Sequence, residues 1–526
     1  MGVISWIAER FGTRTPAPAV KSGKRVYLAG VPTRTNSGFP GGGSYSRSID
    51  AETRYTLRGL RSHSRVLYQN NDYYKKFVRL VVKNVVGPAG FTFKNNAKNA
   101  NGTPDTIVNQ IIREAFFTWG KRGVCDVTGK LSWTDCQRLF IQAVPSDGEV
   151  LVRLVRGFDN PHRFAIQFLE ADHLDENYST VLDNGNEIRM GVEFDKWDRP
   201  VAYHILVKHP GDYTYQRAGN RYERIPAADM VHAFVPERPR QTRGVPWGHT
   251  AMTRLNNLGG YEEAAIVSKR TSASKMGFLV PPAPGDGTEY TGDGNDDDGD
   301  LINEVEPGLL EKLPPGWDFK KFDPAEPGGD FDPFMKRTLR GIAAGLDVSY
   351  HKLASDLEGV NYSSARAGEL DDRDTWNTLQ AWMTESFLDI VFAAWLDVQL
   401  LAGTLVFPSG SPLPYAKIDK FCAPTWRSRS WTWVDPVKDL LASEKELANR
   451  LTSRTRLAAE CGDDLEEIFA ELAAERELAK KYGIELVDPM PAGSTVKMPT
   501  EPKPGKPEPS GAATPAADDA AATVEE

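Results

Sequence analysis

The stretch GELDDRDTWNTLQAWMTESFLDIVFAAWLDVQLLA, residues 368–402, decides much of the fold. No Gly or Pro stands between Glu369 and Ala402, and apolar residues recur every three or four positions, at Trp376, Leu379, Met383, Phe387, Ile390 and Ala394. This spacing predicts one long amphipathic helix. Its most apolar part contains Asp389 and Asp397, which argues against a membrane span. We therefore expect a soluble protein with no membrane partner.

A polar loop stands directly before this helix, within SDLEGVNYSSARAGELDDRDTW (355–376). It carries hydroxyl and amide side chains but no His, no Cys and no recognisable catalytic spacing. Gly359 and Gly368 give the backbone conformational freedom. The loop is a candidate for weak polar contacts rather than for chemistry.

The length of 526 residues exceeds what one hydrophobic core usually supports, so we expect two to four structural regions. The hydrophobic fraction of 40% and the charged fraction of 26% are ordinary for a folded protein. Four scattered cysteines (Cys125, Cys136, Cys422 and Cys461) form no C-x-x-C pair. A reducing compartment is the expected setting.

Charge is distributed unevenly along the chain. Residues 1–90 hold 15 Lys and Arg against four Asp and Glu, whereas residues 285–330 hold three against 14. Blocks of opposite sign suggest surfaces that face different partners, although solvated loops around a folded core would give the same pattern.

Local signals predict further helices and strands. Helices are expected from an Asp72 cap to Gly87, from Thr103-Pro104 to Gly120, from Ser132 onward, from Asp435-Pro436, and from the capping box Asp463-x-x-Glu466 to Gly483. Strands are expected at 149–156, 163–170, 187–194 and 200–208, which indicates an α+β unit with an antiparallel or mixed sheet. Beyond about residue 488 the composition predicts disorder.

The first of these helices has a cationic face. Lys75, Arg79 and Lys83 stand four residues apart and therefore share one side of the helix. That face can meet a phosphate backbone or an acidic neighbour, or it can be a plain solvent-facing surface.

Motifs of known enzyme classes are absent from the sequence. It has no Walker A loop, no G-x-G-x-x-G, no G-x-S-x-G and no H-E-x-x-H, and Ser272-x-x-Lys275 lacks the companion motifs of acylating enzymes. In DGNDDDGD (293–300), Asp298 stands where an EF-hand loop needs Gly. His204 and His209 lack a third ligand nearby in sequence. We expect no catalytic residue, no cofactor and no metal.

The order of several sequence blocks resembles the portal proteins of lambda-type tailed phages. The blocks are HAFVPERPRQTRGVPWGHTAMTRLNNLGGYEEAAIVSKRTSASKMGFLV from His232, LPPGWDFKKFDP, GIAAGLDVSYHKLASDLEGVNYSSARAGELDDRDTW and CGDDLEEIFAELAAERE. In the first block, Gln241, Arg243-Gly244-Val245-Pro246 and Tyr261-Glu262-x-Ala264-Ala265 stand at the expected places. The resemblance covers roughly residues 60–482.

The resemblance implies an α+β portal fold with an α/β wing, two stem helices, a small clip, a long wing helix and an α-helical crown. Carried onto this chain, the parts are a basic flexible arm (1–59), the wing (60–245), the first stem helix (246–277), the clip (278–330), the second stem helix (331–348), the tunnel loop (349–363), the long helix (364–402), a return to the wing (403–435), the crown (436–483) and a disordered tail (484–526).

The resemblance also implies a function. Portal proteins of this type form a ring, here expected to have twelve subunits, at one capsid vertex, through which double-stranded DNA is packaged and ejected. Expected partners are DNA without sequence specificity, the large terminase subunit, a head-completion protein, and the major capsid or scaffold protein. The expected location is the virion, with assembly in the host cytoplasm.

Three groups of site residues follow from this resemblance. The tunnel loop would meet DNA through Lys352, Asn361, Tyr362, Ser363, Ser364 and Arg366. The stem helices would present Lys269, Arg270, Lys275, Lys336, Arg337 and Arg340, and the clip would bind a partner through Asp296, Asp297 and Asp298. The alternatives are a DNA-binding or structural adaptor that forms no ring, and an enzyme such as a nuclease, which would need carboxylates clustered on an ordered scaffold.

Overall fold

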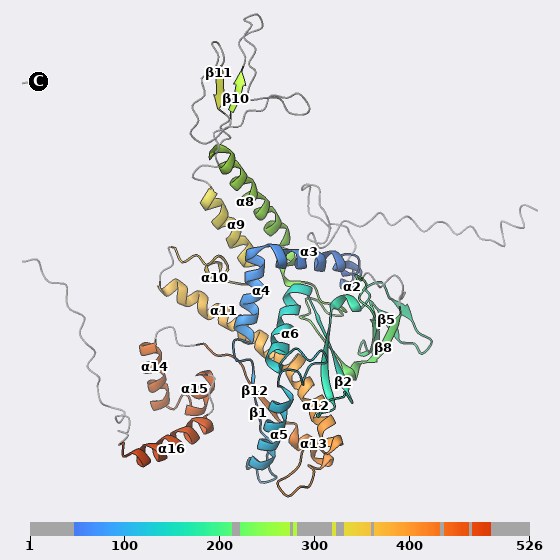
Figure 1. The fold of residues 1–526 in the computed structure, drawn as a ribbon, viewed down its shortest axis with the longest axis vertical. Coiled ribbons are helices and arrows are strands. Elements are labelled where there is room, and N and C mark those ends of the chain that lie inside the picture. The colour runs from blue at the N-terminus through green and yellow to red at the C-terminus, as the bar shows by residue number, and fades with distance from the viewer. Residues whose placement is uncertain are drawn as a thin grey trace, which may run out of the picture. The chain divides into compact units, whose positions relative to one another are not determined.

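The computed structural model describes residues 47–212, 221–273, 277–280, 318–321, 331–358, 362–431, 436–461 and 465–484. The chain divides into two compact units, Met1–Gly462 and Asp463–Glu526, and each is described by itself. The larger unit mixes helices and sheets (Figure 1), as expected for the α+β class. Within the described stretches, no helix is long and apolar enough to cross a membrane.

Two antiparallel sheets form the main β part of the larger unit. The first has the order β3-β2-β9, with β2 at Val150–Arg156, β3 at Phe164–Leu169 and β9 at Met230–Ala233. The second runs in sequence order through β4 (Thr180–Val181), β5 (Glu187–Arg189), β6 (Val192–Phe194), β7 (Pro200–Leu206) and β8 (Tyr222–Pro226).

The expected single strand at 187–194 is wrong, because β5 and β6 are separate strands of a hairpin. Met190 and Gly191 join them with φ angles of 47° and 86°. Two successive left-handed residues suit the tight turn of a hairpin, whose twist matches that of the flanking strands. A Cβ on residue 191 would also lie 2.7 Å from Leu174 Cδ1, so glycine is required there for space as well.

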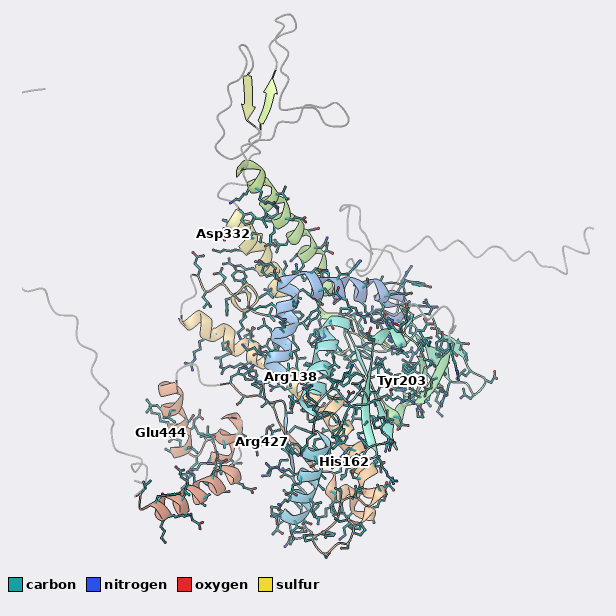
Figure 2. All side chains as sticks on the ribbon, in the orientation of Figure 1. Arg138, His162, Tyr203, Asp332, Arg427 and Glu444 are labelled. Carbon is teal, nitrogen blue, oxygen red and sulfur yellow. The ribbon has the colours of Figure 1, made fainter. Side chains whose placement is uncertain are left out.

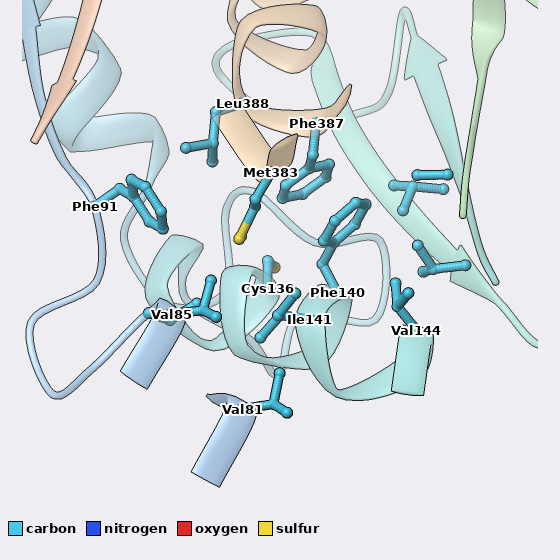
Figure 3. Close-up of a cluster of buried hydrophobic side chains, with 14 of the residues drawn as sticks. Val81, Val85, Phe91, Cys136, Phe140, Ile141, Val144, Met383, Phe387 and Leu388 are labelled. Atoms are coloured by element: carbon cyan, nitrogen blue, oxygen red, sulfur yellow. The ribbon is translucent and has the colours of Figure 1, made fainter. Parts of the chain in front are cut away.

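Helices pack against the sheets and around one large apolar core. They include α3 (Leu57–Asn70), α4 (Asp72–Val85), α5 (Thr106–Trp119) and α6 (Trp133–Asp147). Figure 3 shows part of this core, where Val81 and Val85 of α4 meet Phe140 and Ile141 of α6. Phe387, from far along the sequence, stacks on Phe140 with 4.2 Å between ring centroids. The core therefore joins the N-terminal helices to the long helix.

The long helix is confirmed, with one irregularity. It consists of α11 (Tyr362–Met383), a π-helical turn at Thr384–Leu388 and α12 (Asp389–Ala402). A π turn holds an extra residue and so rotates the faces that follow it. Trp376 and Phe387 of the predicted apolar stripe are buried, but Ile390 is 41% exposed, and Val391 and Trp395 take the inner positions instead.

Some helix starts differ from the sequence expectation. Asn71, and not Asp72, caps α4, and its side chain accepts a hydrogen bond from the Tyr74 N–H. Asp105, and not Thr103, caps α5 in the same way. Ser132 caps α6 as expected, in a capping box with Asp135.

The expected flexible arm also ends earlier than residue 59. Helix α2 (Ile49–Thr53), capped by Ser48, precedes α3, and Ile49 and Leu57 are buried. Residues 1–46 lie outside the described part of the chain. Apolar burial therefore begins about ten residues before the position that composition suggested.

Two helices from separate parts of the chain pack on each other. These are α8 (Met252–Ala273) and α9 (Phe331–Gly345), and the ring of Tyr261 stacks on that of Phe331 at 5.6 Å. Between them in sequence, β10 (Gly277–Val280) pairs antiparallel with β11 (Asp318–Lys321). The two helices lie where helices were predicted at 246–277 and 331–348.

The other α-helices of the larger unit and its last strand lie on either side of the long helix in the sequence. They are α10 (Tyr350–Ala354), α13 (Ile418–Phe421), β12 (Pro424–Arg427), α14 (Pro436–Ala448) and α15 (Arg454–Cys461). Strand β12 pairs antiparallel with β1 (Thr92–Asn95), which returns the chain to its N-terminal helices. In the smaller unit, α16 (Leu465–Tyr482) ends at Gly483 after two lysines, as predicted.

A buried carboxylate, Glu149, connects the two sheets. It receives hydrogen bonds from Arg243 (Nη2 to Oε1, 2.5 Å), from the Gly244 N–H (3.0 Å) and from Arg61 of α3, and His232 of β9 lies 2.9 Å from its Oε2. Burial alone would raise the pKa of Glu149, but the guanidiniums of Arg243 and Arg61 hold it well below its usual value.

The other donors of Arg243 continue this network. They bond to the carbonyls of Ala171 (2.9 Å), Leu174 (2.7 Å) and Met190 (3.1 Å), which border the second sheet. One buried guanidinium therefore holds the first sheet to the loops of the second. This gives a physical role to the arginine of the Arg243-Gly244-Val245-Pro246 motif.

The glycine of that motif is required by a close backbone crossing. A Cβ on Gly244 would lie 2.1 Å from the Gly148 carbonyl oxygen, and one on Gly148 would lie 2.3 Å from the Val245 carbonyl carbon. Gly148 also has a φ of 89°, a conformation that favours glycine. The two glycines bring the segment before β2 against the motif, which positions Glu149 beneath Arg243.

We predict that Glu149→Gln destabilises the protein strongly, because two buried guanidiniums lose their counter-charge. Breaking a buried pair in this way typically costs about 3–5 kcal/mol. Chemical denaturation at neutral pH measures the loss. Glu223→Gln is the matched control, since Glu223 pairs with Arg153 at 2.7 Å but is 47% exposed, and its loss should stay below about 1 kcal/mol.

The difference in unfolding free energy between wild type and Glu149→Gln should depend on pH. Glu149 has a lower pKa in the folded than in the unfolded chain, so its contribution is present above the unfolded pKa. It is lost as the pH falls through the folded value. The difference in unfolding free energy between wild type and Glu149→Gln should therefore become smaller in acid. A difference of the same size at neutral and low pH contradicts this account. So does a loss of stability no larger than that of Glu223→Gln.

Candidate nucleic-acid interface

The stretch expected to form the tunnel loop, residues 349–363, is only partly a loop. Residues Tyr350–Ala354 form α10, which Ser349 precedes and Ser355 ends with a φ of 57°. Residues 355–357 have no regular secondary structure, Glu358 lies in a turn, and α11 already begins at Tyr362. Asn361 lies outside the described residues, and Tyr362, Ser363 and Ser364 form the first turn of α11, where only the backbone is described.

Lys352, the first cation expected to meet DNA, is neutralised within the subunit. Its Nζ lies 2.6 Å from a Glu369 carboxylate oxygen and 2.9 Å from one of Asp372, and only 21% of the side chain is exposed. The Ser349 N–H also donates to Asp372, at 3.2 Å. These contacts tie α10 to α11. Arg366, the other expected cation, is half-buried on α11 and also has an interaction partner.

Short contacts also anchor residues 355–358. The Tyr350 hydroxyl donates to Asp356 at 2.7 Å, and Lys336 of α9 donates to Glu358 at 2.6 Å. Lys76 of α4 contacts the Ser355 hydroxyl. The hydrogen bonds to Glu358 and Asp332 raise the pKa of Lys336, and the hydrogen bond from Tyr350 lowers that of Asp356. The segment is held to three helices, α4, α9 and α10, by charge-assisted hydrogen bonds.

The cations expected on α8 and α9 differ in their surroundings. Lys269, Arg270, Arg337 and Arg340 are exposed, whereas Lys336 lies between Asp332 and Glu358. The Arg340 guanidinium lies 5.4 Å from the centroid of the Tyr350 ring. Lys275, and likewise Asp296, Asp297 and Asp298, lie outside the described residues. The structure therefore does not place all the expected site residues together.

Carboxylates and histidines near the second sheet lie in close contact. His204 Nε2 lies 3.2 Å from Glu193. His209 Nε2 lies 3.3 Å from Glu170 and 3.7 Å from Asp172, a grouping the sequence did not suggest. Arg65 already occupies this cluster, with Nη1 2.6 Å from Asp172, so a metal cation would have to displace a guanidinium.

A cationic cleft of about 620 Å³ lies along the α4 face that carries Arg79 and Lys83. Arg138 of α6, labelled in Figure 2, and Arg429 also line it. The spacing of Lys75, Arg79 and Lys83 indicated the face, but nothing in the sequence connected it to Arg138 or Arg429. Arg429 lies 346 positions after Lys83 in the sequence. Its Nη1 donates hydrogen bonds to the Lys83 carbonyl and to Asn84 Oδ1 (3.3 Å).

Comparisons with known proteins identify the family. A model described as "Phage portal protein, lambda family" matches residues 40–380. A probable portal protein of Halomonas phage phiHAP-1 is 35% identical over 476 residues, covering 90% of this chain and 89% of the relative. Portal protein B of Escherichia phage lambda is 21% identical over 491 residues, covering 84% and 90%.

Similarity to solved structures is weaker. The neck of an empty gene transfer agent particle gives a TM-score of 0.41 with 14% identity, covering 77% of this chain and 94% of that one. Family membership therefore rests on sequence. Portal proteins are structural proteins of the bacteriophage and not enzymes, so the expectation of a non-enzymatic protein is confirmed. The chain belongs to the lambda family of phage portal proteins.

Proposed function

We propose that this protein forms a ring at one capsid vertex and that double-stranded DNA passes through the ring during packaging and ejection. The observation that carries the proposal is the family match over residues 40–380, together with a portal relative aligned over 89% of its length. The ring would have twelve subunits and dock the terminase motor, later the head–tail joining proteins, and the capsid or scaffold protein. It would belong to the virion after assembly in the host cytoplasm.

The proposed architecture assigns the described elements to portal parts. Helices α8 and α9 would be the stem, β10 and β11 would belong to the clip, and α10 with the residues up to 363 would be the tunnel loop. The helix from α11 to α12 would lie above that loop. The two sheets with α3–α6 would form the wing, and α14–α16 the crown.

Exposed apolar side chains on the stem helices support a ring. Ile266 and Val267 of α8 are 58% and 53% exposed, and Phe334 of α9 is 49% exposed. In a closed head-to-tail ring each subunit covers such surfaces with a different face of its neighbour. Burying them between subunits removes apolar area from water, which favours association.

The pairing of the loop cations supports a channel that does not retain DNA. Each contact between a free Lys or Arg and a phosphate adds salt-dependent affinity, and many copies around a ring would slow DNA movement. Lys352 and Lys336 are each held by two carboxylates. Neutral groups of Asn361, Tyr362, Ser363 and Ser364 would then make weak contacts without reading sequence.

We predict that the purified protein assembles into a ring with a central hole. Native mass spectrometry gives the subunit number and negative-stain imaging the hole. Monomers or dimers that bind DNA irrespective of sequence would instead support the alternative, an adaptor protein that forms no ring. This outcome would overturn the proposal.

We further predict that replacing residues 357–363 by a Gly/Ser linker of equal length leaves rings intact but reduces DNA packaging several-fold. The reason is that the linker removes the polar contacts and the Glu358 anchor of the loop. The control replaces the exposed hairpin turn at 183–185, which should change neither property. Unchanged packaging by intact loop-variant rings would remove the loop from the mechanism.

The acidic residues of the proposed clip lead to a separate prediction. Changing Asp296, Asp297 and Asp298 to Asn should weaken binding of the packaging ATPase or head-completion protein and reduce its salt dependence, because charge complementarity governs such encounters. The control neutralises three exposed acids elsewhere, Asp159, Asp183 and Glu187. Equal affinity and equal salt dependence for both variants would exclude an electrostatic role for the clip.

A further inference from the structure

Among the residues that the structure describes, no acidic side chain lines the cationic cleft along α4. Arg79 and Lys83 are exposed, and in the described part of the chain neither side chain forms a hydrogen bond or an ion pair. Arg138 is 37% exposed and its nearest carboxylate is Asp135 at 3.4 Å, which Arg122 also contacts at 2.6 Å. Arg138 also donates to the carbonyls of Gly87 and Pro88, and Arg429 to that of Lys83. Arg79 and Lys83 are thus the uncompensated cations of a cleft lined by four, and such a surface favours an anionic partner.

The cleft also offers apolar surface. Val82 of α4 and Tyr68 of α3 are half-buried, Pro88 is exposed, and all three line it, whereas the neighbouring Val78 is fully buried. A phosphate backbone needs only the cations, whereas a protein segment with both acidic and apolar side chains would use the whole cleft. A fitting partner is therefore a helix that carries carboxylates beside an exposed apolar residue.

Helix α11 of the same chain has such a face. Asp371 and Asp374 are exposed, neither carboxylate forms a hydrogen bond or ion pair with a residue that the structure describes, and Leu370 beside them is 48% exposed. At 100° per residue these three lie within about one third of the helix circumference. The buried residues Asp372 and Trp376 occupy the opposite side. The acidic face of α11 is thus turned away from the core of its own subunit.

The cleft and this face belong to different helices of the subunit. On the helical wheel of α4, the cleft residues Val78, Val82, Arg79 and Lys83 span about 140°. Helix α11 of the same subunit packs at the border of the cleft, where Gln380 donates to the carbonyls of Asn84 at 3.2 Å and Arg429 at 3.0 Å. In a head-to-tail ring, a surface of one subunit is covered by a different surface of its neighbour, so the cleft of one subunit can meet the outward acidic face of another.

We propose that the α4 cleft receives the α11 face of a second copy of this chain, with Asp371 and Asp374 of one subunit against Arg79 and Lys83 of the next. This inference rests on the proposed ring and specifies one of its contacts. Leu370 would enter the apolar part of the cleft. Charge complementarity would then fix the register between neighbouring subunits.

Charge reversal in the full-length protein tests the contact. Arg79→Glu with Lys83→Glu, or Asp371→Lys with Asp374→Lys, should each reduce the ring fraction in native mass spectrometry at least ten-fold, because like charges then face each other. Combining all four substitutions restores opposite charges and should recover rings. The control, Lys98→Glu with Lys130→Glu, makes the same charge change at exposed sites elsewhere and should leave rings intact.

A second measurement does not depend on variants. Rings assembled from equal amounts of heavy-isotope and ordinary wild-type subunits are treated with a carbodiimide, which joins a Lys amine directly to a carboxylate. Peptides linking Lys83 to Asp371 or Asp374 should combine heavy with light chains in about half of cases, as random mixing of two subunits requires. If a reversal variant fails to fold, this measurement decides.

The outcomes separate this inference from the proposed function. A wild-type protein without rings refutes the ring itself. If the wild type forms rings, three results refute the α4–α11 contact alone. Both reversal variants still form rings, or the variant with all four substitutions does not recover them, or cross-linking of wild-type rings joins these residues only within one chain. Rings that persist in Arg79→Glu/Lys83→Glu while binding of short duplex DNA is lost would assign the cleft to nucleic acid and also refute the contact.

Discussion

Glu149 is the group on which the arrangement of the larger unit depends. A carboxylate without access to water is unfavourable unless its charge is balanced and its lone pairs are filled. Arg243, Arg61, His232 and the Gly244 N–H meet that requirement, and they come from three different parts of the chain. The position of each of these parts is therefore tied to the others. The glycine crossing beside Glu149 is part of the same constraint, because any side chain there would push Arg243 away from its partner.

The pairing of cations with carboxylates also distinguishes the proposed tunnel loop from the α4 cleft. Lys352 and Lys336 are paired within the subunit, whereas the side chains of Arg79 and Lys83 in the α4 cleft are not. Positive charge is thus compensated at the proposed tunnel loop and left uncompensated where a fixed partner would bind. The same residue type serves two purposes, and its neighbours decide which.

Periodicity and capping signals predicted the parts of the fold that depend on nearby residues. The helix start at Ser132, the long helix and the Gly483 stop are all local, and each is confirmed. Errors arose where a contact outside the local pattern decided the outcome. The Met190–Gly191 turn divided an apparently continuous strand, and the π turn after Met383 rotated Ile390 outward. Neither leaves a spacing signal in a single sequence.

The candidate sites were less predictable for the same reason. The sequence marked Lys352 as a cation near a polar loop, but the carboxylates that neutralise it lie on the following helix at Glu369 and Asp372. Arg429 reaches the α4 cleft from far along the chain. Such pairings follow from tertiary packing, which composition and periodicity do not encode.

Lys336 couples the position of the proposed loop to the electrostatic potential along α9. One ammonium group holds Asp332 of its own helix and Glu358 of the proposed loop. Any displacement of Glu358 away from α9 removes one negative charge from the surroundings of Lys336 and leaves it with Asp332 alone. The electrostatic potential along α9 therefore depends on the position of the loop. A movement of the loop at Glu358 changes this potential as well.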